Sequence, residues 1–268
     1  MSNLHSYLQP SKPYPQPICT SQEIRDRGSI FVANIFRTTS EDEARKAVAH
    51  LRNVIHGSHR ATHEMYAWRC MVLKAGKTGL AGPDDFQVES GCEDDGERYG
   101  GGKILKIMQS EGIIDAVLVV SRWCVSALPP SVPDRWSLYP ALTIFPSFPR
   151  YGGQMLGPAR FSHIETCARE VSRAFRVRDE VEECVATLTS LDDILASLRA
   201  ELASLTQSHD GAAKGSTKKK QDYGDLLKTL DLPKAKRLVS ARENAIKAVK
   251  ASLQKSREMP TGMASTAD

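Results

Sequence analysis

The chain has 268 residues, of which 41% are hydrophobic and 25% are charged, and its formal net charge is +4. This composition is typical of a soluble protein with one or two domains, and no stretch approaches the ~20 uninterrupted apolar residues of a transmembrane helix. Residues 1–17 lack the apolar core of a signal peptide, and the six cysteines show no CxxC pair. We therefore expect reduced thiols, a cytoplasmic location and no membrane partner.

The first half of the chain predicts an α+β domain over residues 25–176, after a disordered, proline-rich arm at 1–24. Residues 29–36 are rich in β-branched and aromatic side chains, and residues 63–73 alternate, so both are predicted strands. Between them, Ser40 is the expected N-cap of a helix over 41–55, and Glu43 stands at the capping-box position. Further along, the apolar run 113–120 predicts a strand that is buried on both faces.

An acidic turn precedes the next predicted helix. Asp94-Asp95-Gly96-Glu97 leads into Gly100-Gly101-Gly102, and apolar residues then follow at helical spacing. The carboxylates resemble a cation site but lack the spacing of an EF-hand, and the glycines could offer N–H groups to an anion but do not form a P-loop. We expect a turn built of Asp and Gly, and we expect no cofactor and no metal.

Two further features are candidates for binding. His59 and His63 are four residues apart, where a strand begins, which would place both side chains on one face; no third metal ligand is evident, so surface or structural histidines are expected. Arg122, at the end of the buried strand, must find partners, and the Asp94/Asp95 turn is the candidate. The sequence does not separate a structural lock from a binding surface at Arg122. No catalytic nucleophile is marked, so we expect no enzyme.

The segment 124–150 interrupts this pattern. Arg122-Trp123 ends one half of a motif and Tyr151-Gly152-Gly153 begins the other, and joining them gives Val-Ser-Arg-Trp-Tyr-Gly-Gly-Gln-Met-Leu-Gly. A structureless insert of this length is uncommon inside a compact domain. We interpret it as a retained intron that is translated in frame; the alternative is a tolerated surface loop. After Gly157, Pro158 is expected to open another helix.

The C-terminal third is predicted to be helical. Residues 177–206 carry apolar residues at alternating steps of three and four, which indicates a coiled coil or a helical hairpin. Self-association through 177–205 and packing against the tail within one chain both remain open. Residues 207–224 are a predicted linker, 225–256 a basic helical tail with a break near Leu232-Pro233, and 257–268 a disordered end. The tail could contact nucleic acid or be a solvated basic face.

The joined motif closely resembles the signature of the Impact family of translation-regulatory proteins, also known as uncharacterised protein family 0029. The resemblance covers about residues 25–175 apart from the insert. It implies a fold like domain two of ribosomal protein S-five, with helices on one side of a sheet. By motif position, it implies these binding residues: His59, His63, Asp94, Asp95, Gly96, Glu97, Gly101, Arg122, Trp123, Tyr151, Gly152, Gly153 and Gly157.

The same resemblance implies a function. Eukaryotic members of the Impact family bind the ribosome-associated activator of the amino-acid-starvation kinase and thereby restrain phosphorylation of an initiation factor; actin is another partner. We therefore expect a non-enzymatic translation regulator in the general amino acid control stress response. The alternative is a ribosome- or RNA-binding protein that uses the α/β domain and the basic tail.

Overall fold

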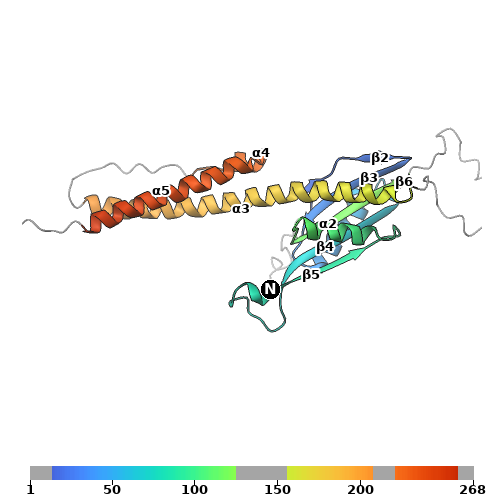
Figure 1. The fold of residues 1–268 in the computed structure, drawn as a ribbon, viewed down its shortest axis with the longest axis horizontal. Helices are drawn as coiled ribbons and strands as arrows, with labels where there is room; N and C mark the ends of the chain where they lie inside the picture. Colours follow the sequence, from blue (N-terminus) through green and yellow to red (C-terminus); the bar gives the residue numbers. More distant parts are fainter. Residues whose placement is uncertain (1–13, 125–155, 208–220, 259–268) are drawn as a thin grey trace, which may run out of the picture. The chain divides into compact units, whose positions relative to one another are not determined.

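The computed structural model describes residues 14–124, 156–207 and 221–258 (Figure 1). The chain divides into two compact units, Met1–Phe175 and Arg176–Asp268. Several predicted features lie outside the described residues. They are the insert except for Cys124, the motif residues Tyr151, Gly152 and Gly153, most of the linker, and both chain ends. The retained-intron hypothesis therefore stays a prediction.

The first unit is built on an antiparallel sheet with the strand order β1-β3-β6-β4-β5, and β2 pairs with β3 beside β1. The long central strands hold the most apolar sequences, and the predicted run at 113–120 continues as a strand through the Arg-Trp pair to Cys124. Two short strands and the edge strand β5 were not predicted from the sequence. The six strands are β1 (Cys19–Thr20), β2 (Ile24–Asp26), β3 (Ser29–Arg37), β4 (His63–Leu73), β5 (Phe86–Glu93) and β6 (Ala116–Cys124).

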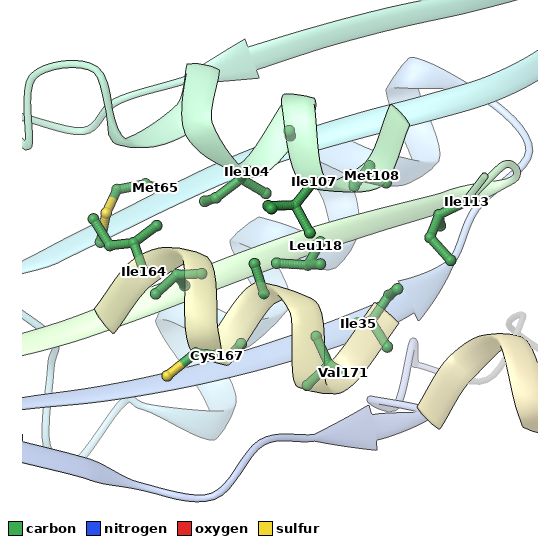
Figure 2. Close-up of a cluster of buried hydrophobic side chains, with 14 of the residues drawn as sticks. Ile35, Met65, Ile104, Ile107, Met108, Ile113, Leu118, Ile164, Cys167 and Val171 are labelled. Atoms are coloured by element: carbon green, nitrogen blue, oxygen red, sulfur yellow. The ribbon is translucent and has the colours of Figure 1, made fainter. Parts of the chain in front are cut away.

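Helices cover both faces of this sheet. On one face, called the α2 face, helix α2 (Gly100–Ser110) and the start of α3 (Ala159–Gln207) pack on the strands. Ile104 of α2 and Ile164 and Val171 of α3 belong to one buried cluster with Leu118 of the sheet (Figure 2). Each such fully buried aliphatic side chain stabilises the fold by roughly 1.5–3 kcal/mol.

The opposite face, called the α1 face, is covered by α1 (Glu41–His50), whose Ala44, Ala47 and Val48 pack against β4 and β6. The expected α+β class is confirmed. The helices were expected on one side of the sheet, but α1 lies on the other side. The reason is that β6 is apolar on both of its faces, and each face must be covered.

The start of α1 follows its sequence. Ser40 accepts a hydrogen bond from the backbone N–H of Glu43 at 3.3 Å, which confirms the predicted N-cap. The Glu43 carboxylate reaches back to the N–H of Thr39 at 3.0 Å, one residue before the capping-box position. The last part of the predicted helix winds as the π-helix η2 (Leu51–Ile55). A short 3-10 turn, η3 (Pro83–Asp85), leads into β5.

The second unit is a helical hairpin. The distal part of α3 packs against α4 (Gly224–Thr229) and α5 (Leu232–Glu258), and the seam residues Val181, Leu188 and Leu195 are buried. The two alternatives for residues 177–205 were self-association and packing against the tail of the same chain. The structure shows packing against the tail. Three ion pairs join the same helices: Lys236–Glu180, Arg242–Asp192 and Arg257–Glu201. The predicted break near Leu232-Pro233 falls where α4 has ended and α5 begins.

A search for membrane-crossing helices within residues 14–124, 156–207 and 221–258 finds none that combines the required length with sufficient apolar character.

Candidate binding site at one end of the sheet

The acidic turn between β5 and α2 caps the helix. The carboxylate of Asp94 accepts hydrogen bonds from the backbone N–H groups of Tyr99 and Gly101, each at 2.8 Å. It satisfies two N-terminal donors and places a negative charge at the positive end of the helix dipole. Gly101 must be glycine here, because an added Cβ would lie 2.6 Å from the carbonyl oxygen of Glu93. The anion bound at the glycine-rich start of α2 is therefore the Asp94 carboxylate of the same chain.

Glu97 is the centre of a buried network on the α2 face. It is 5% exposed and forms ion pairs with the guanidinium groups of Arg122 and Arg160. Arg160 Nε lies 2.7 Å from Glu97 Oε1, but the geometry is too bent for a hydrogen bond. Arg122 also donates to Ser29 Oγ at 3.1 Å and lies over the ring of Phe31. Removing one member of such a group leaves a buried charge without compensation.

Arg122 finds its partner in the predicted turn, and within that turn the carboxylate that it contacts is Glu97 rather than Asp94 or Asp95. Asp94 is already bound to the start of α2. Asp95 turns the other way: its Oδ2 accepts from the N–H of Glu64 at 2.8 Å and pairs with Arg52 at 3.1 Å. Because Arg122 is 8% exposed and held inside the fold, the structure favours the structural lock over an open binding surface.

Glu64 is the centre of a second network, on the α1 face. It is 2% exposed, and its carboxylate lies 2.7 Å from His56 Nδ1 and 2.9 Å from Arg52 Nε, both from the η2 region. Burial raises the pKa of Glu64, but the hydrogen bonds from His56 and Arg52 outweigh burial, and the pKa is lowered overall. Glu64 is therefore an ionised carboxylate that ties η2 to the start of β4.

The two predicted histidines separate. Trp123 donates its indole N–H to the carbonyl of His59 at 3.0 Å, and the two rings are stacked. His63 instead lies on the α2 face, where its Nδ1 is 2.9 Å from the carbonyl oxygen of Asp95. The expectation that both side chains share one face was wrong, because His59 precedes β4 and belongs to a turn rather than to the strand.

The predicted site residues that the structure describes thus form two neighbouring networks at one end of the sheet. Gly157 stands just before α3 with a φ of 53°, and its carbonyl accepts from Arg160 at 3.4 Å. Sequence reasoning missed the partners Ser29, Arg52, His56, Glu64 and Arg160. Only Glu64 carried a signal, because a carboxylate at a core position of a strand requires a buried partner.

This arrangement holds the end of the sheet together through ion pairs and hydrogen bonds. Within the described residues, the buried carboxylates of Glu64, Asp85 and Glu97 each pair with a basic side chain, and no cluster of three potential metal ligands is present. The networks fix the ends of β4 and β6 and the turn into α2, and they offer no open carboxylate to a substrate.

Comparison with known proteins connects this geometry to a family. Residues 27–126 match the model of the Impact N-terminal domain. Protein IMPACT of Mus musculus is 29% identical over 164 residues, which are 61% of this chain and 39% of that protein. Protein IMPACT of Rattus norvegicus is 31% identical over 156 residues, covering 58% and 37% of the two chains. The chain thus spans about two fifths of the length of these relatives.

Among solved structures, the two-domain translational regulator Yih1 is 26% identical over 56% of this chain and 44% of that one, with a TM-score of 0.30. A crystal structure of a hypothetical protein is 18% identical, with a TM-score of 0.34. The match of residues 27–126 includes the acidic turn, β4 and β6, which supply Glu97, Glu64 and Arg122 to the two networks. Over these residues, the α/β unit of this chain matches the Impact N-terminal domain.

Proposed function

We propose that this chain is a non-enzymatic, Impact-type regulator of translation that acts by binding other proteins in the general amino acid control response. The observation that carries the proposal is the match of residues 27–126 to the Impact N-terminal domain. The partner we propose is the ribosome-associated activator of the amino-acid-starvation kinase, as the family resemblance implies; actin is the other candidate, and the cytoplasm is the proposed site of action.

The geometry supports a binding role in a specific way. The family-motif residues contact one another in four pairs, so that the sheet end becomes a rigid platform. The pairs are Arg122 with Glu97, Gly101 with Asp94, His63 with Asp95, and Trp123 with His59. A platform of this kind costs little conformational entropy when a partner binds, because its side chains are already ordered. The predicted site residues therefore act as the support of a recognition surface rather than as its contact points.

The test is a pull-down with the full chain as bait and the starvation-kinase activator as prey. We expect retention of the activator, and we expect that excess chain restrains phosphorylation of the initiation factor in amino-acid-starved cells. A full chain that is folded, as judged by circular dichroism, and that retains no activator would remove the proposal.

A second candidate is binding to ribosomes or RNA, and one observation favours it. Lys236, Arg242 and Arg257 are used in ion pairs inside the hairpin. The other lysines of α4 and α5 are exposed, so the hairpin presents basic charge to solvent. They are Lys228, Lys234, Lys247, Lys250 and Lys255.

Co-sedimentation with ribosomes tests this candidate. Replacing Lys234, Lys247, Lys250 and Lys255 by glutamine should reduce the fraction of the chain that sediments with ribosomes. It should also weaken the dependence of this fraction on salt concentration, because fewer phosphate contacts release fewer counterions on binding. The matched control replaces Lys46 and Lys74 of the first unit. If both variants sediment like the parent chain, the basic hairpin does not bind nucleic acid.

A further inference from the structure

We propose that the edge strand β5 and the acidic hollow beside it form a docking site for an extended peptide that carries a basic side chain. The hollow has a volume of about 580 Å³. It lies on the α1 face, and it is lined by α1, β4 and β5. Neither of the two networks described above contributes a side chain to it. The inference does not rest on the role in translation, and it would hold for a partner in any pathway.

The first observation is an open strand edge. β5 stands at the end of the sheet, and among the strands of the described residues it pairs only with β4 (Figure 1). Seven of its eight residues are exposed. An edge strand presents unpaired N–H and C=O groups along its free side, and such an edge is a template for an added strand. Main-chain hydrogen bonds along β5 would therefore hold an extended segment regardless of its sequence.

The second observation is uncompensated negative charge. Glu89 and Glu93 both line the hollow, and neither forms an ion pair with any residue that the structure describes. Glu93 accepts a hydrogen bond from the hydroxyl of Tyr66 at 2.6 Å, which leaves its charge in place. The only basic residue lining the hollow, Arg45, is paired with Glu41. The hollow therefore carries net negative charge, which is complementary to lysine or arginine.

The third observation is a buried, unpartnered polar group at the floor of the hollow. Trp68 lines the hollow and is 7% exposed, and within the described part of the chain its indole N–H has no acceptor. The edge of the indole ring lies against Gly91, where an added Cβ would be 2.7 Å from Trp68 Nε1. The absence of a side chain at Gly91 therefore makes room for this edge of the indole on the face of β5 that carries the two glutamates.

The register explains why these features act together. Glu93, Gly91 and Glu89 pair with Tyr66, Trp68 and Cys70, so all three lie on the α1 face of β5. A residue of an added strand directly opposite Gly91 would have Glu89 and Glu93 as its two diagonal neighbours, which long side chains can reach. A lysine or arginine at that one position would meet both carboxylates and the indole. The site thus selects an extended segment with a basic residue flanked by uncharged ones.

The experiment is an NMR titration of the full chain with two blocked peptides. Both alternate threonine and valine, and they differ at one central position, which is lysine in one and norleucine in the other. We expect saturable shifts of the β5 amides, with the lysine peptide binding up to about fivefold more tightly because of one partly exposed charge pair. Raising the salt concentration should narrow this difference.

Two variants sharpen the result. Glu89→Gln is exposed and should leave the fold unchanged while weakening the lysine peptide about three- to fivefold. Glu243→Gln, on the exposed side of α5, is the matched control and should bind like the parent. The proposal is overturned if the two peptides bind equally, if the shifts fall outside β5 and the hollow, or if β5 shows no shift at peptide concentrations on the order of 5 mM.

Discussion

Where β4 begins and β6 ends, the carboxylates of Glu64 and Glu97 are buried, and each is held by two basic side chains. Along β5, the carboxylates of Glu89 and Glu93 are exposed and form no ion pair with the residues that the structure describes. The two regions belong to one sheet and use the same functional group. We infer that the buried, paired carboxylates maintain the fold, while the open ones are available to a partner.

The largest effect is expected from Arg122→Met. The change leaves Glu97 buried with Arg160 as its only cation, and breaking a buried pair costs about 3–5 kcal/mol of unfolding free energy. Urea unfolding followed by circular dichroism measures the loss. Arg98→Met, in the same turn but exposed, is the control and should change stability by less than about 0.5 kcal/mol. Equal losses in the two variants would show that the Glu97 network has no structural role.

Gly91→Ala should come next, because the new Cβ would lie 2.7 Å from Trp68 Nε1 and must displace the ring. Overpacking of this kind costs about 1–3 kcal/mol. Thermal unfolding and the Trp68 fluorescence maximum report the change. At Gly102 an added Cβ meets nothing within 4 Å, so Gly102→Ala should stabilise α2 by about 0.5–1 kcal/mol. A Gly91→Ala variant as stable as the parent would contradict the close approach.

Glu64→Gln should have a smaller, pH-dependent effect of about 1–2 kcal/mol at pH 7, from lost charge-assisted hydrogen bonds. The pKa of Glu64 in the folded chain is lowered. Its contribution is therefore fully present above the unfolded pKa of about 4.3 and is lost as the pH falls through the folded value. The stability gap between parent and variant should shrink from pH 6 to pH 3 in urea titrations. A gap independent of pH would mean that Glu64 is not ionised in the fold.

The smallest effect concerns the electrostatics of the hollow. Burial, together with the hydrogen bond to Glu93 and its charge, raises the pKa of Tyr66 to about 12. Glu93→Gln should lower this pKa only in part, because burial remains. Ultraviolet titration near 295 nm, with Tyr66→Phe as the reference, isolates the signal. If the pKa does not fall, Glu93 adds no negative potential at the hydroxyl.

Part of this architecture is predictable from sequence. The apolar run of β6 predicts both its strand and its burial on two faces, and Ser40 with Glu43 predicts where α1 starts. The leucine seam of α3 predicts a helical partner but not which one, because its heptad pattern is compatible with either a second copy or α5.

The site is less predictable, for two physical reasons. Glu97 and Arg160 are distant in sequence, and nothing local relates them until α3 packs on the α2 face. The apolar and polar residues of β5 alternate only over residues 86–89, and Ser90-Gly91 then interrupts the pattern, so the strand is weakly marked in the sequence. Without that strand, Glu89, Gly91 and Glu93 are merely residues two apart, and their common face and the hollow beside them cannot be inferred.

The most direct test of the contrast is equilibrium urea unfolding of Glu97→Gln beside Glu89→Gln. Both changes remove one negative charge and keep the shape of the side chain. We expect a loss of about 3 kcal/mol or more for Glu97→Gln, which leaves two arginines without their carboxylate, and a change within about 0.5 kcal/mol for Glu89→Gln. Similar losses in both variants, or a larger loss at Glu89, would show that the buried and the exposed carboxylates do not differ in their role.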